Sequence, residues 1–93
     1  MNFYKRRDED PRDDEYEHWG TSVWYYQVND DRRIERQLVT YECGVVLAYD
    51  MAHVEDEYGM LGEPLLDAQE WKMYETPASE FESQWVSARP RNR

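Results

Sequence analysis

The chain has 93 residues, of which 40% are hydrophobic and 15% aromatic, and its formal net charge is −10. This length predicts one domain, because a core splits into separate domains only above about 250 residues. Four Trp and eight Tyr residues give more large apolar surface than a disordered chain of this acidity carries, so the chain is expected to fold. The charge disfavours binding to nucleic acid and anionic membranes. It favours a basic partner, or it serves only to keep the protein in solution.

Cys43 is the only cysteine, which excludes an internal disulfide and any C-x-x-C metal or redox motif. No apolar run approaches the ~20 residues that a membrane-spanning helix needs. The first residues, M-N-F-Y-K-R-R-D-E-D-P, lack the apolar stretch of a signal peptide. We therefore expect a soluble protein of the cytoplasm.

Three segments of the chain differ in charge and pattern. Residues 1–18 mix seven acidic and four basic side chains without periodicity, which predicts a flexible charged arm. Residues 19–88 carry fourteen acidic and four basic side chains and are expected to form a single domain. Residues 89–93 contain three arginines and form a basic tail.

The first half of the expected domain has the composition of β-strands. The stretch T-S-V-W-Y-Y-Q-V is rich in β-branched and aromatic residues and predicts a strand at 22–28, followed by the turn-forming N-D-D. R-I-E-R-Q-L-V-T-Y predicts a second strand, in which Gln37 and Val39 share one face and Ile34 and Leu38 share the other. The link E-C-G, in which Gly44 can adopt a positive φ, leads to a third strand at 45–50.

After the third strand the chain is expected to form a loop that crosses the sheet edge, because Y-G-M-L-G-E-P contains two glycines and a proline. Asp67 is placed to cap a single helical turn. The alternation in W-K-M-Y-E predicts a possible fourth strand at 71–75.

A C-terminal helix is the clearest local prediction. In T-P-A-S-E-F-E-S-Q-W-V, Thr76 is a candidate N-cap and Pro77 suits the first helical position. Phe81 and Trp85 are four residues apart and therefore share a face. The expected fold is α+β: a small antiparallel sheet of three or four strands with this helix packed on one face.

The aromatic residues of the first strand cannot all face one layer. Trp24 and Tyr26 lie on one face and Tyr25 on the other. If the helix covers only one face, the aromatics of the opposite face are either candidate contacts or covered by the arm or the long loop. Arg36, in the second strand, is expected to pair with a carboxylate such as Asp50 or Glu42.

The segment D-M-A-H-V-E-D-E-Y-G, residues 50–59, concentrates the candidate functional side chains. It has too few nitrogen or sulfur ligands for zinc, and it lacks the spacing of an EF-hand calcium loop. His53 with Asp50 suits general acid–base chemistry, but no nucleophile accompanies them. The alternative is a structural loop in which Asp50 and Asp56 bond nearby backbone N–H groups, while Tyr58 and Leu61 fold inward.

The succession I-E-R-Q-L-V-T-Y-E-C-G-V-V-L-A-Y-D, H-V-E-D-E-Y-G-M-L, P-L-L-D-A-Q-E-W and F-E-S-Q-W resembles a family of small bacterial β-rich domains of unknown function. The resemblance spans about residues 24–85. It implies a compact β-sheet domain with a terminal helix, and it implies no activity, cofactor or catalytic residue.

These observations predict a cytoplasmic, non-enzymatic protein-binding module, such as an inhibitor or immunity-type protein for a basic partner. Its expected contact residues are Glu55, Asp56, Glu57 and Tyr58, because loop carboxylates steer association and an adjacent aromatic can anchor it. Two other classes stay open. One is a nucleic-acid-mimicking inhibitor of a DNA- or RNA-binding enzyme, and the other is a small metal-dependent enzyme that uses Asp50, His53 and Glu55. Oligomeric state is not predicted, and no cofactor is expected.

Overall fold

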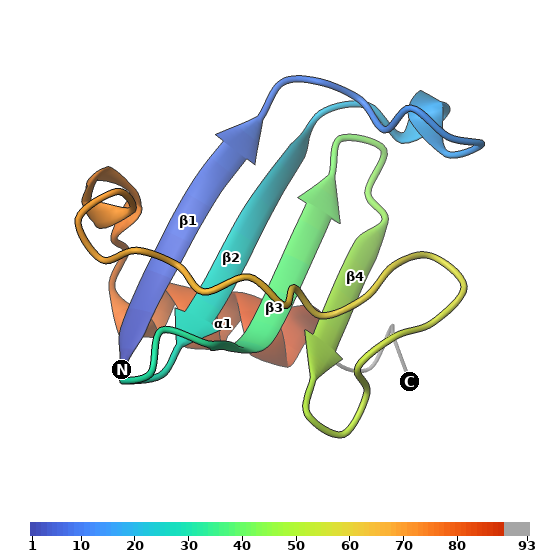
Figure 1. The fold of residues 1–93 in the computed structure, drawn as a ribbon. Helices are drawn as coiled ribbons and strands as arrows, with labels where there is room; N and C mark the ends of the chain where they lie inside the picture. The colour runs from blue at the N-terminus through green and yellow to red at the C-terminus, as the bar shows by residue number, and fades with distance from the viewer. Residues whose placement is uncertain (89–93) are drawn as a thin grey trace.

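The computed structural model of the chain describes residues 1–88, and the basic tail predicted at 89–93 lies outside them. A four-stranded antiparallel sheet of order β1-β2-β3-β4 packs against one C-terminal helix, so the predicted α+β class is confirmed (Figure 1). The elements are β1 (Asn2–Asp8), η1 (Glu17–Trp19), β2 (Ser22–Val28), β3 (Ile34–Tyr41), β4 (Val46–Asp50), η2 (Lys72–Tyr74) and α1 (Ala78–Ala88), where η denotes a 3-10 helix.

The N-terminal segment corrects the prediction of a flexible arm at 1–18. Asn2–Asp8 forms β1, which pairs along its whole length with β2. Tyr4 is the buried residue of this strand, with 1% of its surface exposed, whereas residues 5–8 are all exposed. Charged side chains are typical of an edge strand, where they discourage pairing with other chains. Four of the eleven charged side chains that suggested an arm, those of residues 5–8, therefore belong to an edge strand.

The β2–β3–β4 meander follows the predicted strands closely, and Gly44 takes the expected positive φ of 99° in the last turn. One side chain differs. Ile34 was expected to share a face with Leu38, but it packs in the cluster on the opposite face. The register shifts at the start of β3, since Gln27 pairs with Arg36 while Val28 pairs with Ile34. Such a β-bulge adds one residue to a strand, which moves the residues before it to the other face.

The helix covers one face of the sheet through a compact apolar cluster. Its buried members are Tyr25, Leu38, Ala48, Phe81, Trp85 and Ala88. Phe81 and Trp85 thus share a face, as the four-residue spacing predicted, and Phe81 is fully buried. The Pro77 carbonyl accepts the Phe81 N–H, so the helix starts one residue later than predicted. Thr76 donates its backbone N–H to the Phe3 carbonyl of β1 rather than starting the helix.

Arg36 fastens the helix to the sheet. Its guanidinium binds both carboxylate oxygens of Glu82 at 3.0 and 2.5 Å, and its Cζ lies 4.8 Å from the Phe81 ring centroid. The hydrogen bonds from Arg36 hold the pKa of Glu82 below its usual range. The prediction named Asp50 or Glu42 as the partner carboxylate. The helical Glu82 was missed because its position over Arg36 depends on how the helix crosses the sheet.

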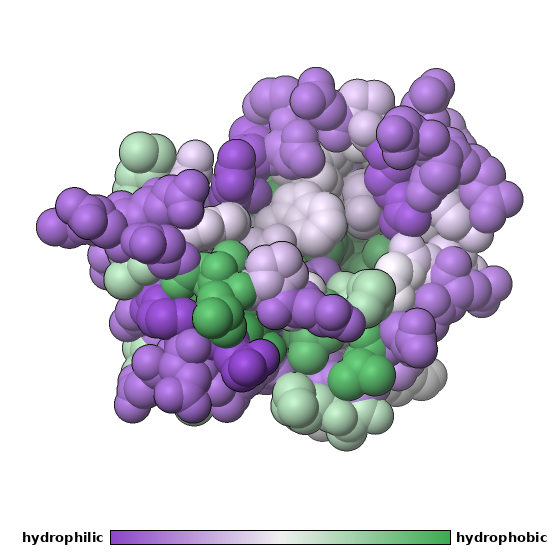
Figure 2. All heavy atoms as spheres, viewed as in Figure 1, coloured by the Kyte–Doolittle hydropathy of each residue, from purple (hydrophilic) through white to green (hydrophobic). Residues whose placement is uncertain are grey.

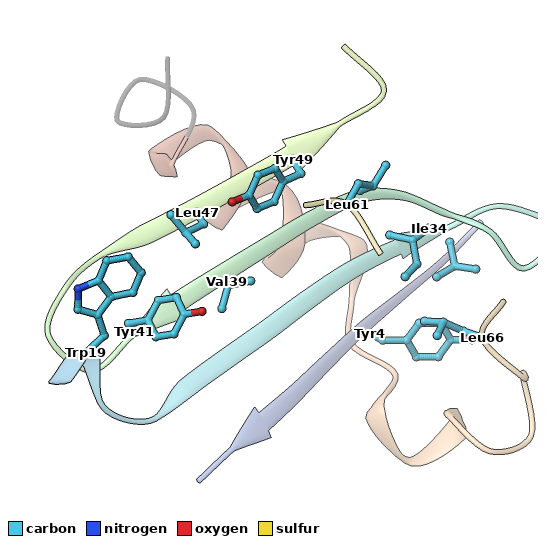
Figure 3. Packing of buried hydrophobic residues seen from close by; sticks show 10 residues of the cluster. Tyr4, Trp19, Ile34, Val39, Tyr41, Leu47, Tyr49, Leu61 and Leu66 are labelled. Atoms are coloured by element: carbon cyan, nitrogen blue, oxygen red, sulfur yellow. The ribbon is translucent and has the colours of Figure 1, made fainter. Parts of the chain in front are cut away.

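The opposite, front face of the sheet carries the larger cluster (Figure 3). It contains Tyr4, Trp19, Val28, Ile34, Val39, Tyr41, Leu47, Tyr49, Leu61 and Leu66. Residues 51–77, the crossing segment, run over this face between β4 and α1 (Figure 1). Within it, Asp67 caps a turn as predicted, since its Oδ1 accepts the backbone N–H groups of Gln69 and Glu70.

The predicted fourth strand at 71–75 is wrong. These residues include the 3-10 helix Lys72–Tyr74, and the fourth strand of the sheet is β1 instead. Trp71 and Tyr74 are three residues apart, so the tight helical turn brings their rings to the same side, 5.3 Å apart. Both rings then pack against the Arg6 guanidinium of β1, at 5.3 and 5.1 Å. Alternating hydrophobicity suggested a strand here, but packing against β1 decides the conformation.

Within residues 1–88, no helix is long and apolar enough to cross a membrane.

Candidate functional site

The acidic loop, residues 50–59, is organised around the carboxylate of Asp56. Asp56 Oδ1 accepts hydrogen bonds from the backbone N–H groups of Tyr58 and Gly59 at 2.9 and 3.1 Å. The same oxygen accepts the hydroxyl of Tyr49 at 2.8 Å, which ties the loop to β4. Asp56 Oδ2 lies 3.4 Å from His53 Nε2. One carboxylate therefore satisfies both the loop backbone and two side chains beneath it.

These contacts shift the pKa values of Asp56 and Tyr49. Burial alone would raise the pKa of Asp56, but the Tyr58 amide, the Tyr49 hydroxyl and His53 together hold it below its usual range. Burial, reinforced by the hydrogen bond to Asp56, raises the pKa of the Tyr49 hydroxyl well above its ordinary value. Asp56 thus stays ionised and Tyr49 stays protonated at neutral pH, and these are the forms in which the hydroxyl donates to the carboxylate.

Gln37 fixes the chain just after the acidic loop. This β3 side chain is buried, with 3% exposure. Its Nε2 donates to the Met60 carbonyl at 3.1 Å, and its Oε1 accepts the Gly62 N–H at 2.8 Å. A side-chain amide that bonds both ways in this manner replaces a pair of backbone bonds between strands. The crossing segment is therefore held on the front face by polar contacts as well as by Leu61, which is buried as predicted.

The four predicted contact residues fall into two pairs. Glu55 and Glu57 are exposed on the loop surface. Asp56 faces inward as described above, and Tyr58 is partly buried, with its ring 5.7 Å from Trp19 and 5.4 Å from Tyr16. Asp56 and Tyr58 thus hold the loop, while the two glutamates are the ones turned to solvent.

Asp50 and His53 pair through two backbone hydrogen bonds, but the structure does not bring their side chains together with Glu55 as a metal site. Asp50 Oδ1 accepts the Ala52 N–H at 2.9 Å, and the His53 ring stacks on Tyr49 with 5.7 Å between centroids. Glu55 instead faces the cleft described below. Among the residues that the structure describes, no group of three or more His, Cys, Asp or Glu side chains is placed to hold a metal ion.

An apolar cleft of about 600 Å³ opens between the β2–β3 turn and the crossing segment. Its apolar lining includes Ile34, Met51, Val54, Met60 and Leu61. Its polar lining includes Asn29, Arg33, Glu35, Glu55 and Glu63. Figure 2 shows apolar side chains gathered on this face beside the lower end of β4, next to hydrophilic ones. We call this feature the acid-rimmed cleft.

Of the residues that line this cleft, only Glu55 belongs to the contact residues predicted from the sequence. Met51, Val54 and Met60 lie within or beside the acidic loop, but their hydrophobicity has no helical or strand period that would mark a surface. Glu35 is the extra residue of the β3 bulge, and Glu63 follows it 28 residues later in the chain. Only the return of the crossing segment over β3 brings them together.

The front-face aromatics form a second, shallower feature. Trp24 and Tyr26 stack at 6.2 Å and are only partly buried, as expected for aromatics on the face that the helix does not cover. Trp71 of the crossing segment meets Tyr26 edge to face at 5.5 Å. Burial raises the pKa of Tyr26 to about 12. These rings are therefore covered in part by the crossing segment, which was one of the two predicted outcomes.

Comparison with known protein families, with curated proteins and with solved structures found no match to this chain. The resemblance to a family of small bacterial domains stays a prediction. The role of the site is therefore inferred from the residues of this chain alone.

Proposed function

We propose that this chain is a non-enzymatic, cytoplasmic protein-binding module that recognises a basic partner, in the manner of an inhibitor or immunity-type protein. The observation that carries the proposal is the pair of exposed carboxylates, Glu55 and Glu57, on a loop whose backbone is fixed by Asp56. The net charge of −10 adds a long-range attraction for a positively charged surface.

A fixed loop favours binding because less conformational entropy is lost when the partner docks. Asp56 and Gln37 supply this order in the unbound protein, one within the loop and the other just beyond it. Exposed carboxylates on such a loop accelerate encounter with a basic protein and select against acidic ones. The proposed contact surface is therefore centred on Glu55 and Glu57, with Asp56 and Tyr58 as its support.

The test is affinity capture from a lysate of the source organism at low and high salt, with the wild-type chain and two matched variants. E55Q/E57Q removes the loop charges. E70Q/E75Q removes the same charge from exposed glutamates of the crossing segment near η2, on the β1 side of the sheet (Figure 1). We expect the wild-type chain to capture a basic protein at low salt and to capture less of it at high salt. The E55Q/E57Q variant should fail to capture it, whereas E70Q/E75Q should capture it as the wild type does. If both variants lose capture equally, the overall charge and not the acidic loop causes binding. If neither variant captures less than the wild type, the proposal is contradicted.

A further inference from the structure

We infer that the acid-rimmed cleft is the anchor site for this partner, and that it takes an apolar side chain from a segment of the partner rich in lysine or arginine. The inference rests on the proposed function and adds the chemistry of the bound segment. It is carried by the juxtaposition of three exposed apolar side chains with a rim of three glutamates.

Three apolar side chains of the cleft are exposed to solvent in the free protein. Met51 is 72% exposed, Val54 48% and Met60 49%, and all three line the same cleft. Single exposed apolar residues are ordinary, but a group that lines one concave surface is typical of a binding site. Two of the three are methionines, whose flexible thioether side chains adapt to partners of different shape.

The rim determines which partner fits. Glu35, Glu55 and Glu63 supply three carboxylates, and Arg33 is the one basic side chain among the described lining residues. A hydrophobic segment flanked by acidic side chains would meet repulsion here, whereas one flanked by lysine or arginine would form ion pairs at the edge of the cleft. A basic segment that also carries an apolar side chain can contact both the apolar lining and the glutamates of the rim.

The walls of the cleft are already formed in the free protein. The Leu61 N–H donates to the Val54 carbonyl at 2.7 Å, and Glu55 pairs with Met60 in an antiparallel bridge. This small hairpin fixes the backbone of four lining residues before any partner arrives. The volume of the cleft, about 600 Å³, also falls within the range of about 300–1,000 Å³ found for pockets that bury a ligand. Binding then requires the ordering of side chains, with no folding of the loop.

Two synthetic peptides of equal charge separate the contribution of the apolar side chains to binding from the contribution of charge. One carries lysines and arginines around a central leucine and phenylalanine, and the other has serines in place of those two residues. Affinities are measured by fluorescence anisotropy at low and moderate salt. For the wild-type chain we expect the anchored peptide to bind at least tenfold more tightly, because partial burial of two large side chains contributes more than about 1.4 kcal/mol.

A matched pair of variants locates the effect. M51Q/V54T makes two cleft residues polar with little change of shape, and M73Q/V86T makes the same change at Met73 and Val86, which are exposed elsewhere at 79% and 68%. We expect M51Q/V54T to lower affinity for the anchored peptide about tenfold and M73Q/V86T to leave it unchanged. Because all four side chains are exposed, the fold should persist, and circular dichroism of each variant checks this.

The outcomes distinguish the inference from the proposed function. Equal, salt-sensitive binding of both peptides would overturn the anchor site while leaving a charge-driven binding module in place. Equal loss of anchored-peptide binding in both variants would also overturn it, since the apolar contact would then lie outside the cleft. Failure of both peptides to bind, together with failure to capture a basic protein, would contradict the proposed function itself.

Discussion

The hydroxyl of Tyr49 donates a 2.8 Å hydrogen bond to Asp56 Oδ1, which connects a buried residue of β4 to the carboxylate that organises the acidic loop. Tyr49 is 1% exposed and its ring lies against the sheet (Figure 3). The sheet therefore fixes this ring, and the hydrogen bond from its hydroxyl helps to fix the position of Asp56. The loop that presents Glu55 and Glu57 is therefore part of the folded core's hydrogen-bond network. Its stability and its binding geometry depend on the same carboxylate.

Replacement of Asp56 by asparagine tests this dependence. D56N removes the charge that accepts bonds from two backbone N–H groups and from Tyr49. Hydrogen bonds to a charged group contribute about 1.5–3 kcal/mol each, but asparagine keeps one acceptor oxygen. We expect the free energy of unfolding at pH 7 to fall by about 1–3 kcal/mol, measured by urea denaturation. D13N, at an exposed acidic position, is the control and should change it by less than about 0.5 kcal/mol.

The same residue gives a pH dependence of defined sign. The pKa of Asp56 is depressed by folding, so its ionised form stabilises the native state. This contribution is complete above the unfolded-state pKa of about 3.9 and is lost as the pH falls through the lower folded pKa. The difference in unfolding free energy between wild type and D56N should be constant near neutrality and shrink below about pH 4. A difference that stays constant through the acid range would show that Asp56 acts by shape alone.

The N-terminal strand supplies a prediction that separates the observed fold from a flexible arm. Tyr4 is buried in the front cluster, and its hydroxyl accepts a 2.6 Å hydrogen bond from Arg32. Truncation of a large buried aromatic costs about 3–5 kcal/mol. We expect Y4A to unfold the chain or to lower its melting temperature by more than 10 °C, an approximate figure for a domain of this size. R7A, on the same strand but exposed, should have little effect, and equal stability of both variants would contradict the strand.

The elements that the sequence predicted best are those with local causes. The strand at 22–28 needs only β-branched and aromatic composition, and the turn at Gly44 needs only a residue that tolerates a positive φ. The helix follows from the spacing of Phe81 and Trp85, and it begins directly after Pro77. Each of these signals lies within a dozen residues of the chain.

The errors have non-local causes. β1 is a strand because it pairs with β2, and its charged residues carry no alternating signal of their own. Ile34 changes face because of a bulge that is set by the pairing of β2 with β3. The cleft is assembled from the bulge residue Glu35 and from a segment that returns over it, so its composition could not be found in any one stretch. The acidic loop, by contrast, was found from sequence, although the inward role of Asp56 depends on Tyr49.

Gln37 is the residue whose substitution should release the crossing segment. Q37L keeps the side chain's size but removes the donor to the Met60 carbonyl and the acceptor for the Gly62 N–H. Because Gln37 is 3% exposed, these backbone groups would lose their partner in a partly buried position, at about 1–3 kcal/mol for each unsatisfied group. We expect hydrogen exchange at the Gly62 amide to accelerate at least tenfold by NMR, while amides of β2 change less.

Gln69 supplies the control for this experiment, since it is exposed on the same crossing segment. Q69L should leave the exchange of Gly62 at the wild-type rate. If Q37L affects the cleft as the structure requires, the affinity for the anchored basic peptide should also fall, because Met60 forms one wall and its carbonyl is bound by Gln37. Unchanged exchange at Gly62 in Q37L would mean that apolar packing alone, through Leu61, holds the segment on the sheet.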